Sequence, residues 1–157
     1  KELGTTRGLE ASPLVKDGIL YTTGNWSVVY AFDAKTGEQK WTYDPKVDRT
    51  KAIFFCCDVV NRGVALFEGK IFVGAIDGRL IAIDAKTGKL LWSVETLPPD
   101  SMHTCTGAPR VFDGKVLIGH GGADWARWFG FIALILACVN IFGGFLVTQR
   151  MLRMFRR

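Results

Sequence analysis

Residues that bind transition metals are scarce in this sequence. It contains two histidines and four cysteines in 157 residues, and no two cysteines are spaced as Cys-x-x-Cys. A structural zinc site needs four such ligands close together, so the composition gives no support to a zinc protein. The Gly-x-Gly-x-x-Gly pattern of dinucleotide-binding folds is also absent, which argues against a nucleotide-binding domain.

An excess of charge of one sign is also missing from most of the chain. Residues 1–126 hold 15 Lys and Arg and 15 Asp and Glu, so the formal net charge of +5 comes entirely from five later arginines: Arg127, Arg150, Arg153, Arg156 and Arg157. These arginines flank an apolar run, as charges at a membrane edge do, rather than forming a basic surface for nucleic acid. We therefore predict no nucleic-acid partner.

The apolar run itself extends from Trp128 to Val147 and contains no charged residue. A helix of about 20 apolar residues spans the roughly 30 Å of a bilayer core, so the run predicts a transmembrane helix; a buried core helix is the alternative. More arginines follow the run than precede it. By the positive-inside rule we expect the C-terminus in the cytoplasm and the preceding residues on the opposite side.

One phrase occurs twice. Residues 31–41 read AFDAKTGEQKW and residues 82–92 read AIDAKTGKLLW. Each copy predicts a strand, a tight turn in which Asp bonds its own backbone and Gly adopts a positive φ, and a second strand that ends in Trp. A hairpin that recurs with one tryptophan at a fixed position is typical of β-propeller blades, whose neighbours pack against one another. Two unrelated hairpins are the alternative.

Three further turns mark the starts of blades. They are Asp17-Gly18, Glu68-Gly69 and Asp113-Gly114, each followed by a short β-rich run. We expect an inner strand over Gly8 to Val15 before the first turn. After the third turn no second hairpin follows, so the sequence predicts two blades and part of a third. A propeller has at least four blades, so we expect a fragment or part of an assembly.

Residues 8 to 124 resemble a known family. The runs ASPLVKDGILYTTGNWSVVYAFDAKTG, CCDVVNRGVALFEGKIFVGAIDGRLIAIDAKTGKLLWSVET and TGAPRVFDGKVLIGHGGAD are similar to the first blades of alcohol dehydrogenases that depend on pyrroloquinoline quinone (PQQ). These periplasmic quinoproteins are eight-bladed propellers. The resemblance implies an all-β fold: a partial eight-bladed quinoprotein-type propeller over residues 1–124, followed by one transmembrane α-helix within residues 125–157.

The resemblance also implies a cofactor site. By position, Cys56 and Cys57 would form a vicinal disulfide against the quinone, and the Arg62 guanidinium would pair with a PQQ carboxylate or quinone oxygen. Asp124 stands where the family has a glutamate ligand to calcium or, in some relatives, a lanthanide, although its side chain is shorter. The full predicted set for the cofactor is Glu10, Cys56, Cys57, Arg62, Thr106, Gly121, Gly122 and Ala123.

Each of these residues also has a plain structural interpretation. The Cα atoms of adjacent residues lie about 3.8 Å apart, below the usual separation for a disulfide, so Cys56 and Cys57 can equally be two reduced cysteines. Arg62 can be a surface arginine, Glu10 a solvated strand end, and Thr106 a loop hydroxyl. Asp124 can be a helix cap.

The tail resembles a different family. FIALILACVNIFGGFLVTQRMLRMFRR, within residues 128–157, is similar to a transmembrane helix from the α-subunit of the proton-translocating NAD(P) transhydrogenase. We therefore expect a junction between the two resemblances at about Asp124 to Phe131.

Taken together, the patterns predict part of a PQQ-dependent alcohol dehydrogenase. It would be periplasmic, with one membrane anchor over residues 128–147, and would act in the intact family on an alcohol and an electron acceptor. Catalytic residues from later blades are missing, so we expect no complete active site. The alternatives are a membrane-tethered propeller that binds without catalysis, and a fragment of the transhydrogenase membrane region.

Overall fold

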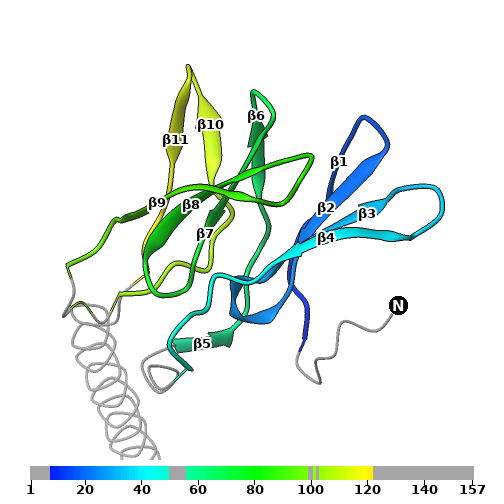
Figure 1. The fold of residues 1–157 in the computed structure, drawn as a ribbon. Helices are drawn as coiled ribbons and strands as arrows, with labels where there is room; N and C mark the ends of the chain where they lie inside the picture. Colours follow the sequence, from blue (N-terminus) through cyan, green and yellow to red (C-terminus); the bar gives the residue numbers. More distant parts are fainter. Residues whose placement is uncertain (1–7, 50–55, 99–100, 102, 122–157) are drawn as a thin grey trace, which may run out of the picture. The chain divides into compact units, whose positions relative to one another are not determined.

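The computed structural model describes residues 8–49, 56–98, 101 and 103–121, with only the backbone of Cys56 and Cys57. The chain divides into two units, Lys1–Gly122 and Ala123–Arg157, and every described residue belongs to the first. Three antiparallel sheets follow one another along the chain (Figure 1). The first sheet contains β1 (Leu14–Lys16), β2 (Ile19–Thr23), β3 (Val29–Asp33) and β4 (Gln39–Tyr43). The second sheet contains β6 (Ala65–Phe67), β7 (Lys70–Gly74), β8 (Arg79–Asp84) and β9 (Leu90–Glu95). The third sheet contains β10 (Arg110–Phe112) and β11 (Lys115–Leu117). Outside these sheets lie the 3-10 helix η1 (Asn25–Ser27) and β5 (Cys56–Val59).

The first two sheets are copies of one four-stranded blade. Their strands pair in chain order, and the third sheet repeats only the first two strands. The three predicted turns lie where the sequence placed them, between the first and second strands of each sheet. In each turn the residue before glycine also has a positive φ, at Asp17, Glu68 and Asp113. The prediction of two blades and part of a third is therefore confirmed for the described residues.

The repeated hairpin turn is built by its aspartate. In the second blade, Asp84 Oδ1 accepts hydrogen bonds from Lys86 N at 3.1 Å and from Thr87 N at 2.7 Å. The Thr87 hydroxyl donates to the same oxygen and contributes most to lowering the pKa of Asp84. Gly88 closes the turn at φ +72°, a left-handed conformation that glycine adopts without a steric penalty. The turn at Asp33 in the first blade has the same geometry, because its sequence is the same.

The two tryptophans of the repeat occupy the same register position. Ala31 pairs with Trp41 and Ala82 with Trp92, and each sheet has a register shift immediately after this pair. Trp41 packs on the second blade: its indole N–H donates to the carbonyl of Ala85 at 3.0 Å. Trp92 remains 41% exposed, although its ring lies against Phe72. Trp41 thus packs against the β8–β9 hairpin of the second blade, while Trp92 has no such hairpin beside it among the described residues.

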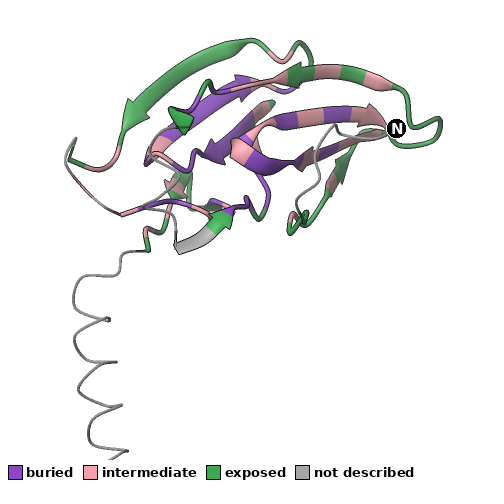
Figure 2. Ribbon diagram, turned by 90° about the horizontal axis from the view of Figure 1, so that it is seen from below, coloured by how far each residue is buried: buried purple, intermediate pink, exposed green. Residues whose placement is uncertain are grey.

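The core lies along the middle strands and between the first two blades (Figure 2). Val29, Ile71, Val73, Ile81 and Ile83 are fully buried, and apolar side chains of both blades belong to the same cluster. Burying such side chains stabilises each by roughly 1.5–3 kcal/mol relative to exposure. Strand β9 is exposed along its whole length, since among the described residues no outer strand of the third blade covers it.

The inner strand expected over Gly8 to Val15 is wrong in extent, because β1 begins at Leu14 and only Ser12 makes an isolated bridge before it. Pro13 has no N–H to donate to a ladder.

The predicted membrane helix over 128–147, with its domain 125–157, lies outside the described residues. Within the described residues, the structure contains no helix of sufficient length and apolarity to cross a bilayer.

Candidate functional site

Three chain segments that precede the first strands of the three blades lie side by side. Ser12 N donates to the Arg62 carbonyl at 3.2 Å, and Arg62 N donates to the Thr106 carbonyl at 2.9 Å. Ser12 also forms a parallel bridge with Gly63. The middle segment is therefore held on both sides by backbone bonds, which positions the residues at this end of the blades.

Arg62 joins side chains from all three segments. Its Nη2 lies 2.9 Å from the Glu10 Oε2, and its Nη1 donates to the Thr106 hydroxyl at 2.6 Å. Glu10, Arg62 and Thr106 together form what we call the arginine cluster. The side chains of Glu10 and Arg62 are 47% and 44% exposed, so the guanidinium is ordered by its neighbours yet open to solvent. An ordered guanidinium of this kind suits a planar carboxylate ligand.

Asn61 anchors the segment that carries Arg62. It is buried, and its amide nitrogen donates to the Gly74 carbonyl at 2.8 Å and to the Ser27 hydroxyl at 3.3 Å. Its amide oxygen accepts from Gly63 N at 3.0 Å. Both polar atoms of a buried side chain are thus satisfied, and the bonds connect the segment to two blades.

Gly63 permits the close contact between the first two segments. It adopts φ +127°, and a Cβ placed there would lie 2.9 Å from the Ser12 carbonyl oxygen. A side chain would therefore clash with backbone that cannot easily move.

Cys105 fixes the third segment in a similar way. It is fully buried, and its backbone N–H donates to the Ile76 carbonyl at 3.4 Å. Its sulfur fills the space beside Gly74, where a Cβ would come within 2.4 Å of it. Burial raises the pKa of this thiol to about 11, so it is a packing residue rather than a reactive one.

The chain after β11 returns to the third segment. Gly121 and Thr104 exchange two backbone hydrogen bonds of 2.9 Å, two residues before Thr106. The neighbouring His120 places its Nε2 2.7 Å from the Thr96 hydroxyl, which itself donates to the Gly78 carbonyl. Among the described residues, nothing lies within 4 Å of a Cβ built on Gly121.

The structure thus brings together three of the predicted site residues, Glu10, Arg62 and Thr106, and places Gly121 beside the segment that carries Thr106. The side chains of Cys56 and Cys57 lie outside the described part of the structure, as do Gly122, Ala123 and Asp124, so the disulfide and the metal ligand stay predictions. Among the described residues, no three His, Cys, Asp or Glu side chains group closely enough to hold a metal ion.

Asn61 is the positioning residue that sequence reasoning missed. A single asparagine has no periodicity or spacing to mark it. The one sign of it in the sequence is that Asn61 directly follows the apolar pair Val59-Val60 and precedes Arg62. In the structure Val59, Val60 and Asn61 are all buried. A buried polar side chain requires partners, so it indicates a structural anchor.

Comparison with known proteins identifies the repeats. The family model described as the glucose/ethanol/alcohol dehydrogenase β-propeller domain, named for PQQ, matches residues 1–94, more than half of the chain. This chain belongs to that PQQ-dependent family. The predicted family and the all-β propeller fold are therefore confirmed.

The relatives of this quinoprotein chain are alcohol dehydrogenases. The 1-butanol dehydrogenase (cytochrome c) of Thauera butanivorans is 58% identical over 125 residues, which are 79% of this chain and 18% of that protein. The structure of ADHIIG from Pseudomonas putida HK5 is 58% identical with a TM-score of 0.75, covering 77% of this chain and 18% of that one. A europium-containing methanol dehydrogenase is 42% identical with a TM-score of 0.70, covering 76% and 21%. The chain thus spans about a fifth of the length of these relatives.

Two weaker similarities concern the fold and the tail. BamB from Moraxella catarrhalis is 20% identical, with a TM-score of 0.52 over 69% of this quinoprotein chain and 29% of that one, and shares the fold alone. A second family model, described as the 4TM region of pyridine nucleotide transhydrogenase, matches residues 110–157. That match includes β10 and β11, which the structure places in the third sheet of the propeller unit.

Proposed function

We propose that this chain forms the first blades of a PQQ-dependent alcohol dehydrogenase and that its arginine cluster holds part of the cofactor. The observation that carries the proposal is the contact of Arg62 with both Glu10 and Thr106. Counting Arg62 itself, the three residues come from the segments that precede three different blades. These contacts hold the guanidinium at a solvent-open end of the blades, where a ligand can reach it.

The residues present fit the cofactor. PQQ carries three carboxylates on a flat ring system, and a guanidinium has five N–H donors in a planar fork. Two described contacts engage the two terminal nitrogens of Arg62, and the side chain is 44% exposed, so donors remain for a ligand. Glu10 balances the charge of the guanidinium in the free protein. When bound, PQQ supplies the electron acceptor for alcohol oxidation.

The remaining parts of the site are proposed from the family. A disulfide between Cys56 and Cys57 would lie against the quinone, Gly121, Gly122 and Ala123 would allow backbone to approach the cofactor, and Asp124 would contribute to a calcium or lanthanide site. The metal proposal is supported by the similarity to a europium-containing enzyme. The disulfide requires an oxidising compartment, in agreement with a periplasmic location.

The activity of the intact protein is proposed from the printed functions of the relatives. They include a 1-butanol dehydrogenase that uses cytochrome c and alcohol dehydrogenases that use quinone. We propose an alcohol as substrate and one of these two classes of acceptor. Because this chain spans only about a fifth of such proteins, we expect the 157 residues alone to show no alcohol oxidation with PQQ and calcium.

Equilibrium dialysis of the full chain against PQQ in the presence of calcium tests the cofactor site. We expect saturable binding that Arg62→Ala weakens by roughly 10-fold to 100-fold, because a charge-assisted hydrogen bond is worth about 1.5–3 kcal/mol. Arg110→Ala, at an exposed arginine in β10, is the matched control and should bind as the unaltered chain does. Equal binding by both variants would refute the role of the arginine cluster, and no binding at all would favour a non-catalytic binding module.

We also propose that residues 128–147 anchor the chain in the inner membrane, with the blades in the periplasm and the C-terminus in the cytoplasm. The uncharged run and its flanking arginines support this topology, as does the match of the tail to a transhydrogenase membrane region. Protease added to spheroplasts should remove the blades and leave the tail protected. Recovery of the chain in the soluble fraction after carbonate extraction would overturn the anchor.

A further inference from the structure

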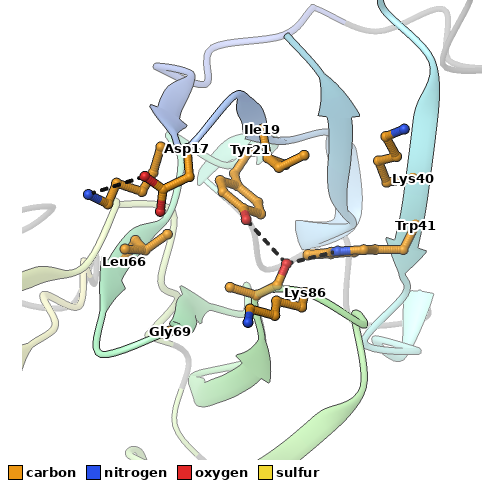
Figure 3. A pocket seen from close by; sticks show the side chains of 10 residues that line it. Asp17, Ile19, Tyr21, Lys40, Trp41, Leu66, Gly69 and Lys86 are labelled. Carbon is orange, nitrogen blue, oxygen red and sulfur yellow. Dashed lines mark hydrogen bonds and ion pairs between the residues drawn. The ribbon is translucent and has the colours of Figure 1, made fainter.

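A cavity lies between the first two blades, separate from the arginine cluster. Its volume is about 430 Å³, within the roughly 300–1,000 Å³ range of small-molecule sites. The first blade contributes the end of β1, the β1–β2 turn and residues of β2 and β4, and the second blade contributes β6, the β6–β7 turn and the β8–β9 hairpin (Figure 3). We call this space the interblade cavity. None of the three residues of the arginine cluster, Glu10, Arg62 and Thr106, lines it.

The walls of the interblade cavity are mainly aromatic and aliphatic. The hydroxyl and the indole N–H of their two aromatic residues already donate hydrogen bonds within the protein. Tyr21 and Trp41 lie with ring centroids 5.9 Å apart. The Tyr21 hydroxyl donates to the Ala85 carbonyl at 3.2 Å, and the Trp41 indole N–H donates to the same oxygen at 3.0 Å (Figure 3). Ile19 and Leu66 add apolar surface. A ligand therefore finds apolar walls, and its polar contacts must come from charged side chains.

Those charged side chains are mostly cationic. Lys16, Lys40 and Lys86 line the interblade cavity, with Asp17 as the only lining carboxylate. Lys16 lies 3.5 Å from Asp17, and Lys40 lies 3.3 Å from Glu38 and 3.7 Å from Asp33, so two ammonium groups are partly neutralised. Lys86 forms no ion pair within 4 Å with another described residue, although its charge contributes to lowering the pKa of Asp84.

The blade fold does not require two of these charges, Lys16 and Lys40. The second blade carries Phe67 where the first carries Lys16, each immediately before the turn to the second strand, and Leu91 where the first carries Lys40, each before the tryptophan. The two blades fold alike with apolar residues at these positions in one and lysines in the other. Lys16 and Lys40 are therefore not required by the blade, whereas Lys86 belongs to the repeated turn and recurs in the first blade as Lys35.

We propose that the interblade cavity binds a small aromatic carboxylate, with its ring against Trp41 and Leu66 and its carboxylate toward the Lys86 ammonium. The apolar walls favour a flat hydrophobic body, and the three lysines that line the cavity favour a negatively charged group. The site is independent of the proposed PQQ site, because none of the residues of the arginine cluster lines it.

Isothermal titration of the full chain with 2-naphthoate tests the proposal. We expect saturable binding that Lys86→Ala weakens about threefold to fivefold, the loss expected for one solvent-exposed ion pair. Lys35→Ala is the matched control, because Lys35 follows Asp-Ala in the first copy of the same turn but does not line the cavity. The neutral analogue 2-naphthamide should bind more weakly than 2-naphthoate and should be unaffected by either substitution.

A second pair of variants distinguishes the loss of the binding site from misfolding of the chain. Lys16→Phe and Lys40→Leu install the residues that the second blade already carries, so the blade should fold, and their combination should weaken 2-naphthoate binding further. Arg62→Ala should leave it unchanged. The proposal is overturned if 2-naphthoate does not bind saturably, if Lys35→Ala and Lys86→Ala lose equal affinity, if the amide binds as well as the carboxylate, or if Arg62→Ala abolishes binding.

Discussion

Adding one methyl group at Gly88 should destabilise the chain far more than adding it at Gly37. Both glycines close the repeated Asp-Ala-Lys-Thr-Gly turn at φ +72°, and both donate a backbone hydrogen bond of 2.9 Å to the aspartate that opens the turn. They differ in what lies beside them. In the described part of the chain, a Cβ on Gly37 meets nothing within 4 Å, whereas a Cβ on Gly88 lies 2.7 Å from Trp41 Cδ2 of the preceding blade.

The expected magnitudes follow from these two environments. Alanine in the left-handed conformation costs about 1–2 kcal/mol, and both variants incur this cost. Gly88→Ala also drives a methyl into a ring, an overpacking that typically costs about 1–3 kcal/mol more. Two other ring atoms, Cε3 and Cγ, lie 2.8 Å from the same position, so a small rotation of the indole does not relieve the clash. Rotation would also break the bond from the indole to Ala85.

The assay is urea unfolding of the full chain followed by far-ultraviolet circular dichroism. We expect Gly37→Ala to lower the free energy of unfolding by about 1–2 kcal/mol and Gly88→Ala by about 2–5 kcal/mol. Combining Gly88→Ala with Trp41→Leu should recover part of the difference, because the clashing ring is removed. Equal losses for the two single variants would mean that the tryptophan does not pack on the second blade, and the propeller arrangement would be refuted.

Three other predictions concern single side chains. Asn61→Ala should lower the free energy of unfolding by about 2–4 kcal/mol, measured by the same urea assay, because it leaves buried backbone groups without partners; a change below 1 kcal/mol would contradict the anchoring role. Hydrogen bonds, chiefly from Thr87, lower the pKa of the Asp84 carboxyl below its ordinary 3.8. The stabilising effect of the ionised carboxylate is therefore complete above that value and is lost as the pH falls below it. Asp84→Asn should flatten the fall of the urea midpoint between about pH 5 and pH 3, and an unchanged dependence of the midpoint on pH would contradict this. Cys105, with a pKa of about 11, should resist iodoacetamide at pH 8 until urea is added, as peptide mass spectrometry would show.

The repeated phrase explains why much of the fold could be predicted from the sequence. Each Asp-Ala-Lys-Thr-Gly turn depends on local interactions, an aspartate that accepts nearby backbone N–H groups and a glycine with positive φ, so the residues alone determine it. The β-rich run that follows the Asp17-Gly18 turn forms strand β2, Ile19–Thr23. Alternating apolar residues and short turns set the register of a hairpin without help from distant segments.

Contacts between distant segments could not be predicted in the same way. Sequence reasoning assigned Glu10, Arg62 and Thr106 to one cofactor but did not predict that Arg62 pairs with the other two. Such contacts depend on how three segments stack, and no local pattern encodes that stacking. The inner strand was placed too early for a related reason: the residues before Pro13 lie in the segment that reaches toward Arg62 instead of continuing a ladder.

The two tryptophans illustrate the limit of reasoning from a repeat. Their identical spacing predicted identical roles, and their register is indeed the same. Their burial differs because it depends on the neighbouring blade, which has an outer hairpin beside Trp41 and, among the described residues, none beside Trp92. A repeat thus predicts the geometry of a blade, while the next blade decides the environment of its outer face.

The most direct test of the central claim follows the side-chain Nε–H signal of Arg62 by nuclear magnetic resonance while PQQ and calcium are added to the full chain. The signal can be assigned by its loss in Arg62→Lys. We predict a saturable shift for Arg62 and none for Arg79, whose guanidinium is held by Asp77 and the Pro45 carbonyl. An unmoved Arg62 signal at a PQQ concentration that saturates binding would contradict the cofactor site.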